Sequence, residues 1–286
     1  MSKARESKAK IIIETVLILV LTFSLLFIVV NLVLDKKSEK KMEDLRNQIK
    51  SSRIQFEEIN IPDEAIADNE RKAQEKAELE MAESDESNET KPTPKVLQIY
   101  KELHDKNENF AGWLYVDGTS LEYPIMKGPD NQFYLSHDMD GAYDKHGMLI
   151  MDDHCKLDAD NAQMIIYGHN VNTGKLFGEL LFYKDEGYCN YHPVISFDTI
   201  YEQGNYEIFS AFITTVTDAQ KESGIFTSFT FEDEESFNKL VEWSKGKSLY
   251  KRDYTPSFGD DILTLVTCEH SNDEGRFVVM AGKKHK

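Results

Sequence analysis

The sequence predicts a mainly β fold, a closed or nearly closed barrel with helical insertions, preceded by a transmembrane helix and a stalk. Three observations support this prediction: an uncharged apolar run at 16–34, a glycine-free polar segment at 36–95, and eight short β-rich runs after residue 110. The 286 residues are 40% hydrophobic and 11% aromatic, which is enough apolar material for a globular core.

The N-terminal apolar run has the length of a membrane span. Residues 16–34 are 19 in number and carry no charge. The run ends at Leu34 and Asp35 rather than at the small-x-small site of a cleaved signal peptide, so we expect an uncleaved anchor over 11–34 after a short tail at 1–10. Lysine and arginine flank the run almost equally on both sides, so their distribution alone does not orient it.

Residues 35–95 are expected to form a charged stalk and linker. Apolar residues recur every three or four positions between 42 and 59, which favours a single solvated helix over a coiled coil. Beyond Pro62 the tract reads as helical or disordered, and prolines at 92 and 94 indicate a flexible linker. The net charge of the whole chain, -18, argues against a nucleic-acid partner.

The remaining residues, 96–286, are expected to form one globular domain. Apolar spacing predicts an opening helix at 96–104, and two further helices are predicted at 176–183 and 232–245. Turn residues separate eight predicted strands, at 112–116, 121–126, 148–151, 163–167, 194–197, 206–215, 262–267 and 277–281.

Of the three cysteines, Cys268 has the setting of a nucleophile. It stands at the exit of an apolar predicted strand, and strand alternation places it on the same face as Val266. A buried structural cysteine is the competing interpretation. The odd number of cysteines leaves at least one thiol unpaired within the chain, and a bridge between Cys155 and Cys189 stays open.

Two charged or titratable residues are expected near this thiol. The polar connection 269–275 predicts an antiparallel return that brings Arg276 beside Cys268, where a guanidinium can hold an oxyanion, although a surface ion pair is the alternative. A cysteine nucleophile also needs a proton acceptor, and His169 follows an apolar predicted strand. His270, two residues beyond the cysteine, is the rival base.

These motifs resemble those of the sortases of Gram-positive bacteria. The resemblance rests on Thr264-Leu265-Val266-Thr267-Cys268, on Arg276 eight positions later, and on Tyr167-Gly168-His169-Asn170, all behind an N-terminal anchor. Further stretches resemble class B in particular, namely Gly112-Trp113-Leu114, Tyr123-Pro124-Ile125, Asp130-Asn131-Gln132-Phe133-Tyr134-Leu135 and His137-Asp138. The resemblance covers 96–283 and leaves out the stalk.

The resemblance implies a closed eight-stranded sortase-type barrel and a transpeptidase that cleaves a C-terminal sorting signal of the Asn-Pro-x-Thr-Asn/Gly type after threonine. A thioacyl enzyme would then be resolved by an amine of the peptidoglycan cross-bridge. The implied roles of nucleophile, general acid and base, and oxyanion or substrate clamp belong to Cys268, His169 and Arg276. No metal or other cofactor is implied.

The same resemblance implies which residues line the signal groove and where the enzyme works. The groove positions are Asn131, Leu135, Tyr167 and Glu269. Val266 stands where many class B members have serine, so a hydroxyl contact to the signal is missing. The implied partners are surface proteins bearing the signal, a peptidoglycan amine, and the membrane through 11–34. An enzyme of the cell wall must face outward, which makes the tail cytoplasmic and the catalytic domain extracellular.

Other functions remain open at this point. A pilus-polymerising sortase is the alternative enzyme, although neither an N-terminal lid nor a second apolar segment near 282–286 is evident. A distant alternative is a non-catalytic metal-binding surface protein that uses His154, Cys155, Cys189 and His192 as zinc ligands. A membrane-anchored scaffold whose stalk does the binding is a further alternative.

Overall fold

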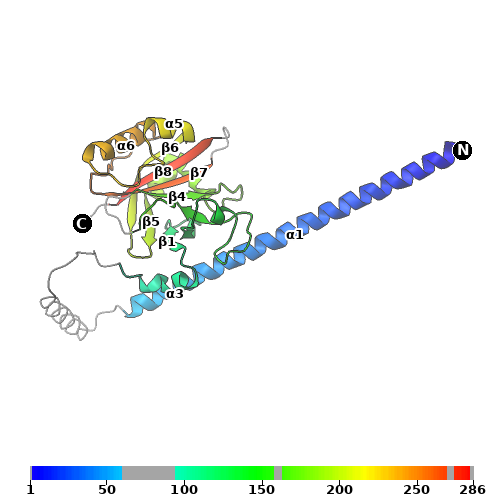
Figure 1. Cartoon of the computed structure of the whole chain (residues 1–286), viewed down its shortest axis with the longest axis horizontal. Coiled ribbons are helices and arrows are strands. Elements are labelled where there is room, and N and C mark those ends of the chain that lie inside the picture. Colours follow the sequence, from blue (N-terminus) through cyan, green and yellow to red (C-terminus); the bar gives the residue numbers. More distant parts are fainter. Residues whose placement is uncertain (1, 60–93, 158–162, 269–273, 284–286) are drawn as a thin grey trace. The chain divides into compact units, whose positions relative to one another are not determined.

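The computed structural model describes residues 2–59, 94–157, 163–268 and 274–283, and the chain divides into two compact units, one ending at Lys50 and one beginning at Ser51. Helix α1 (Ser2–Ile59) is continuous through the apolar run and the predicted stalk helix (Figure 1). Within the described residues it is the one helix long and apolar enough to cross a membrane, as judged by length and composition alone. The predicted linker between 60 and 93 lies outside the described residues.

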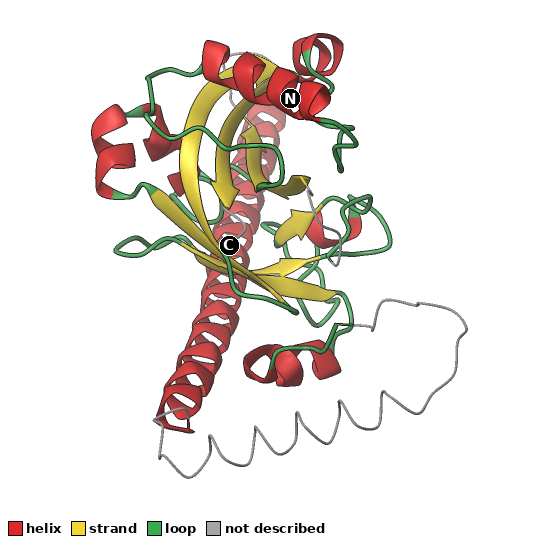
Figure 2. Cartoon of the chain, turned by 90° about the vertical axis from the view of Figure 1, so that its left-hand side faces the viewer, coloured by secondary structure: helices red, strands yellow, loops and turns green. Residues whose placement is uncertain are grey.

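The second unit contains a barrel of eight strands, which close in the order β1-β2-β3-β4-β7-β8-β6-β5. Figure 2 shows these strands in yellow as a strongly curved sheet. All eight predicted strands are therefore confirmed, with small changes at their ends. Their bounds are β1 Phe110–Tyr115, β2 Glu122–Met126, β3 Leu149–Met151, β4 Gln163–Gly168, β5 Val194–Thr199, β6 Asn205–Thr215, β7 Asp261–Cys268 and β8 Gly275–Lys283. The β2–β3 and β4–β7 pairs are parallel and the other pairs are antiparallel.

Apolar side chains on these strands fill the core. The largest fully buried side chains include Trp113, Phe197, Tyr206 and Phe277, which come from four different strands. Closure of the sheet through the β1–β5 pair leaves the eight described strands without an open sheet edge.

Two of the three helices predicted in this domain are confirmed. They are α3 (Gln98–Lys106) and α6 (Glu234–Lys247). The side chain of Asp233 accepts a bond from the backbone N–H of Ser236 and so begins α6 at a defined residue. The hydroxyl of Ser210 on β6 donates to the carbonyl of Ser244 at 2.6 Å, which holds α6 against that strand (Figure 1).

The helix predicted at 176–183 is wrong in type and starting point. Leu176 has φ 50, a left-handed conformation that an α-helix excludes, and the following helix is the 3-10 helix η2 (Glu179–Lys184). Three short elements were not predicted, α4 (Glu186–Tyr191), α5 (Val216–Glu222) and η1 (Phe133–Leu135). They have three to seven residues, which is too few for a helical period to show in the sequence.

Candidate active site

Three neighbouring strands carry the predicted catalytic residues to one end of the barrel. In the parallel β4–β7 pair, Gly168 is the register partner of Thr267, so His169 and Cys268 follow side by side. In the antiparallel β7–β8 pair, Cys268 is the partner of Arg276. Because adjacent strands lie about 4.8 Å apart, Cys268 stands between an imidazole and a guanidinium. All three residues are half-buried.

Three residues on neighbouring strands, Ile150 on β3, Tyr167 on β4 and Val266 on β7, form the floor of a cleft. Tyr167 is the register partner of both Ile150 on β3 and Val266 on β7. The cleft has a volume of about 310 Å³, and the three predicted catalytic residues line it together with these floor residues. Asn131 and Leu135, from η1 and the residues before it, line the same cleft. Three of the four predicted groove residues therefore meet there.

The imidazole of His169 is oriented by a backbone carbonyl. Its Nε2 lies 3.0 Å from the carbonyl oxygen of Leu135. A carbonyl only accepts hydrogen bonds, so Nε2 carries the proton, and Nδ1 is the basic nitrogen of the neutral ring. The side chain of Asp130 supports this loop by accepting bonds from the N–H groups of Gln132 and Phe133, both at 2.8 Å. These two bonds hold the pKa of the Asp130 carboxyl below its usual value.

Gly147 allows a second loop to approach the Leu135 carbonyl. It has φ 59, and a Cβ at this position would lie 2.3 Å from both the carbonyl carbon and the carbonyl oxygen of Leu135. Any side chain would therefore displace the group that orients His169. The glycine is required here by close backbone contact as well as by its left-handed conformation.

Two side-chain bonds join the ends of β4 and β7 in addition to the strand ladder. The hydroxyl of Thr267 donates to the carbonyl of Gly168 at 2.8 Å, in a buried environment. The side-chain amide of Asn170 donates to the carbonyl of Cys268 at 3.1 Å. These bonds fix the relative positions of the backbones that carry the thiol and the imidazole.

Tyr167 presents its ring to the cleft and its hydroxyl to a carboxylate. The hydroxyl donates to Oδ2 of Asp152 at 3.1 Å. Burial raises the pKa of Tyr167 above its usual value, and the adjacent Asp152 carboxylate raises it further. The phenol is therefore neutral at physiological pH and acts as a hydrogen-bond donor.

Some residues of the cleft were not predicted from the sequence, and two predicted residues lie outside the described part of the chain. Val216 and Phe226 line the cleft, but they belong to a stretch without a motif or a regular apolar pattern, and only the fold brings them there. Glu269, predicted in the groove, and His270, the rival base, lie outside the described residues.

The other two cysteines take no part in this cleft. Cys155 and Cys189 are buried free thiols, so the bridge between them that the sequence left open is not formed. Burial raises the pKa of the Cys155 thiol to about 12. The zinc site considered for His154, Cys155, Cys189 and His192 does not assemble, since the described residues bring His154 together with Asp152 and Asp153 instead.

A half-buried thiol between an imidazole and a guanidinium, at the edge of a peptide-sized cleft, has the groups required by a cysteine acyl-transfer enzyme. The Sortase domain family model matches residues 114–284. The chain belongs to the sortase family, and its relatives place it in class B as a cysteine transpeptidase. Sortase B of Staphylococcus aureus is 31% identical over 184 residues, 64% of this chain and 73% of that protein.

Other relatives and solved structures agree. Sortase B of Listeria monocytogenes is 29% identical over 181 residues, covering 63% of this chain and 71% of its own. A sortase B–substrate complex of S. aureus has a TM-score of 0.66 and 26% identity, covering 87% of this chain and 97% of that one. Sortase B of Clostridium perfringens has a TM-score of 0.59 and 28% identity, covering 65% of this chain and 99% of its own.

Proposed function

We propose that this enzyme cleaves a C-terminal sorting signal of the Asn-Pro-x-Thr-Asn/Gly type after threonine and transfers the surface protein to an amine of peptidoglycan. The position of Cys268 between His169 and Arg276, at the edge of the cleft, is the observation that carries this proposal. The similarity to an S. aureus sortase B that has been solved as a substrate complex supports a sorting-signal substrate for this enzyme.

In the acylation half-reaction, Sγ of Cys268 attacks the threonine carbonyl carbon, and the thiol proton passes to Nδ1 of His169. The carbonyl oxygen gains negative charge, which the guanidinium of Arg276 stabilises through its fixed N–H donors. His169 then gives its proton to the leaving amine as the C–N bond breaks. The Leu135 carbonyl keeps the ring oriented throughout, because it accepts from Nε2 in both charge states of the imidazole.

The deacylation half-reaction runs through the same groups. A peptidoglycan amine attacks the thioester carbon, and its proton passes to His169. The C–S bond breaks, and the departing sulfur of Cys268 is reprotonated by the imidazolium. The product is an amide, so the energy of the original peptide bond is kept in the new one and no other reactant is needed.

The signal is proposed to bind along the floor of the cleft. Asn131, Leu135 and Tyr167 lie in positions to contact it, and Glu269 is assigned the same role by the family resemblance. Val266 gives the floor an apolar surface directly below Cys268, so we assign it an apolar contact with the residues before the scissile bond.

Residues 11–34 are proposed to be the membrane anchor. The apolar side chains of α1 between Ile13 and Leu34 are exposed, as a lipid-facing helix requires. The tail at 1–10 would then be cytoplasmic, the segment 35–95 would be a spacer, and the catalytic domain at 96–286 would face the cell wall.

The decisive experiment uses the full chain in detergent micelles with a library of quenched peptides that contain Asn-Pro-x-Thr-Asn or Asn-Pro-x-Thr-Gly. We expect cleavage after threonine, and we expect Cys268→Ala and His169→Ala to lose at least about 1,000-fold in kcat/KM. His270→Ala is the matched control and should stay within about twofold. Without an added amine, mass spectrometry should find only the acid formed by hydrolysis of the thioester. When a primary-amine peptide is added, it should also find the amide product.

Two results contradict the proposal in different ways. If the Cys268→Ala variant still cleaves the peptide, the thioacyl mechanism is wrong. Loss of cleavage in His270→Ala but not in His169→Ala leaves the mechanism in place and moves the general base to His270.

A further inference from the structure

Asp152 is a buried carboxylate directly behind the wall of the cleft. It follows the last residue of β3, and only 4% of its surface is exposed. Burying a carboxylate is unfavourable unless hydrogen bonds compensate for the lost water, so its partners show what it holds in place.

Two of these partners line the cleft and come from different parts of the chain. Oδ2 of Asp152 accepts the hydroxyl of Tyr167, on β4, at 3.1 Å, and the side-chain amide of Asn131, before η1, also at 3.1 Å. One carboxylate oxygen therefore connects two segments of the cleft wall.

The amide of Asn131 is held at both ends. Its oxygen accepts the backbone N–H of Asp153 at 2.8 Å, and its nitrogen donates to Oδ1 of Asp153 at 3.3 Å in addition to Asp152. The side chain of Asn131 can therefore rotate only if these bonds are broken. Its position at the cleft depends on the segment 152–153 rather than on η1 alone.

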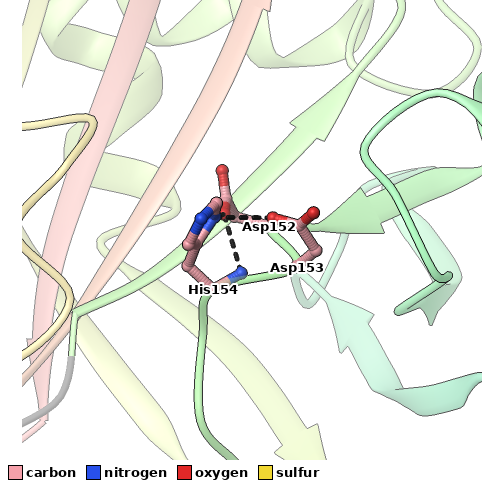
Figure 3. A group of neighbouring side chains, drawn as sticks. All are labelled: Asp152, Asp153 and His154. Carbon is pink, nitrogen blue, oxygen red and sulfur yellow. Dashed lines mark hydrogen bonds and ion pairs between the residues drawn. The ribbon is translucent and has the colours of Figure 1, made fainter.

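The second oxygen of Asp152 is also fully engaged. Oδ1 accepts the backbone N–H of His154 and lies 3.0 Å from Nδ1 of its ring, while Oδ1 of Asp153 lies 2.6 Å from the same nitrogen. Figure 3 shows the three side chains directed toward one another. All groups that contact the Asp152 carboxylate are thus donors, and a carboxylate is the side chain that accepts on both oxygens.

We propose that Asp152 is a positioning residue for the sorting signal, which it serves by fixing the Tyr167 hydroxyl and the Asn131 amide in the cleft wall. This inference rests on the proposed function. Replacement by asparagine keeps the shape but turns one acceptor into an NH₂ group, which faces either the Tyr167–Asn131 side or the His154 side. In both orientations a donor meets a donor, and the network must rearrange.

Asp152, Asp153 and His154 also have ligand atoms within 4.8 Å of one another, as a metal site would. The Asp152 oxygens, however, already accept bonds from the cleft wall and from His154. We therefore assign the group to holding the protein wall and not to binding a cation.

The test compares Asp152→Asn with Asp198→Asn in the full chain. Asp198 on β5 is a matched control, because it is also buried, 3% exposed, and accepts a tyrosine hydroxyl, that of Tyr100, at 2.5 Å, away from the cleft. We expect Asp152→Asn to raise KM for an Asn-Pro-x-Thr-Asn peptide about tenfold with kcat within about threefold. Asp198→Asn should leave KM unchanged while lowering the melting temperature at least as much.

A second variant, Tyr167→Phe, removes one of the two cleft-side bonds and keeps the ring. Its KM should rise about threefold, and the double variant with Asp152→Asn should show less than the product of the two single effects, because both changes break the same contact. If Asp152→Asn does not fold, Tyr167→Phe alone decides, and an unchanged KM in that variant overturns the inference.

Several outcomes separate this inference from the proposed function. A wild-type enzyme that cleaves the peptide, with an Asp152→Asn variant of unchanged KM, overturns the role of Asp152 alone. An equal rise of KM in Asp198→Asn, or a double variant equal to the product of the single effects, overturns it as well. A wild-type enzyme that cleaves no signal peptide overturns the proposed function and this inference together.

Discussion

Replacing Gly168 with alanine should damage both stability and activity, because this residue has no room for a side chain. A Cβ at Gly168 would lie 2.2 Å from Cδ2 of Leu149 and 2.7 Å from Cδ2 of Phe177. Carbon atoms in contact prefer about 3.5 to 4.0 Å, so Leu149 must move by more than about 1 Å and Phe177 by about 0.8 Å or more. Both neighbours are fully buried, which leaves them little space to move into.

The expected magnitude follows from this overlap. Overpacking of a well-packed core lowers the free energy of unfolding by about 1 to 3 kcal/mol. For a domain of this size, each kcal/mol lowers the melting temperature by about 2 to 4 °C, so Gly168→Ala should melt about 2 to 12 °C lower than the wild type. Since His169 is the next residue, a displacement of about 1 Å should also lower kcat/KM by about 10- to 100-fold.

Gly246→Ala is the matched control for this substitution. Gly246 lies near the end of α6, and no atom lies within 4 Å of the position that its Cβ would take. Alanine in a helix is favoured over glycine by about 0.5 to 1 kcal/mol, so this variant should melt slightly higher and keep full activity. Thermal melting and cleavage of a quenched signal peptide measure both quantities.

Two results refute the reasoning at different steps. A Gly168→Ala variant with the melting temperature of the wild type shows that Leu149 and Phe177 yield easily. A variant that melts lower but retains kcat/KM shows that the end of β4 does not set the position of His169.

Two further predictions concern thiol reactivity and pH. In the native protein, iodoacetamide at pH 8 should label only Cys268, because Cys155 and Cys189 are buried. In denaturant it should label all three cysteines. Labelling of Cys155 in the native protein, detected by mass spectrometry, contradicts this prediction. The pKa of His154 is raised, mainly by its hydrogen bond to Asp152 and then by the charge of Asp153. Protonated His154 therefore stabilises the folded protein fully below about pH 6.5, and this stabilisation is lost as the pH rises through the folded-state pKa. The wild type should accordingly melt at a higher temperature than His154→Gln at pH 5.5, and the two melting temperatures should converge at high pH or in 1 M salt. A difference in melting temperature that grows with pH contradicts the pairing.

The barrel could be predicted from the sequence because its strands are short apolar runs bounded by turn residues. The run before Cys268 and the run before His169 read as strands, and both are strands that meet in one parallel pair. The sequence could not specify that pairing from local pattern alone, since register between distant strands depends on packing across the whole barrel. The adjacency of Cys268 and Arg276 was predictable, because a short connection joins their antiparallel strands.

The parts that sequence reasoning missed depend on contacts distant in the chain. Val216 and Phe226 reach the cleft through the path of the chain after β6, which has no recognisable motif. Asp152 was not predicted as a site residue, since nothing local indicates that its carboxylate accepts bonds from Asn131 and Tyr167. Leu176 was placed in a helix because the apolar pattern does not reveal its left-handed backbone.

The parallel β4–β7 pair has a consequence for how this enzyme matures. The bond between Thr267 and Gly168 joins residues 99 positions apart in the chain, with β5, β6, α5 and α6 between them. Closing so long a loop is entropically unfavourable and makes this pairing one of the late, slow events of folding. A chain synthesised only as far as β6 contains His169 without Cys268, so the thiol and the imidazole come together only when β7 pairs with β4.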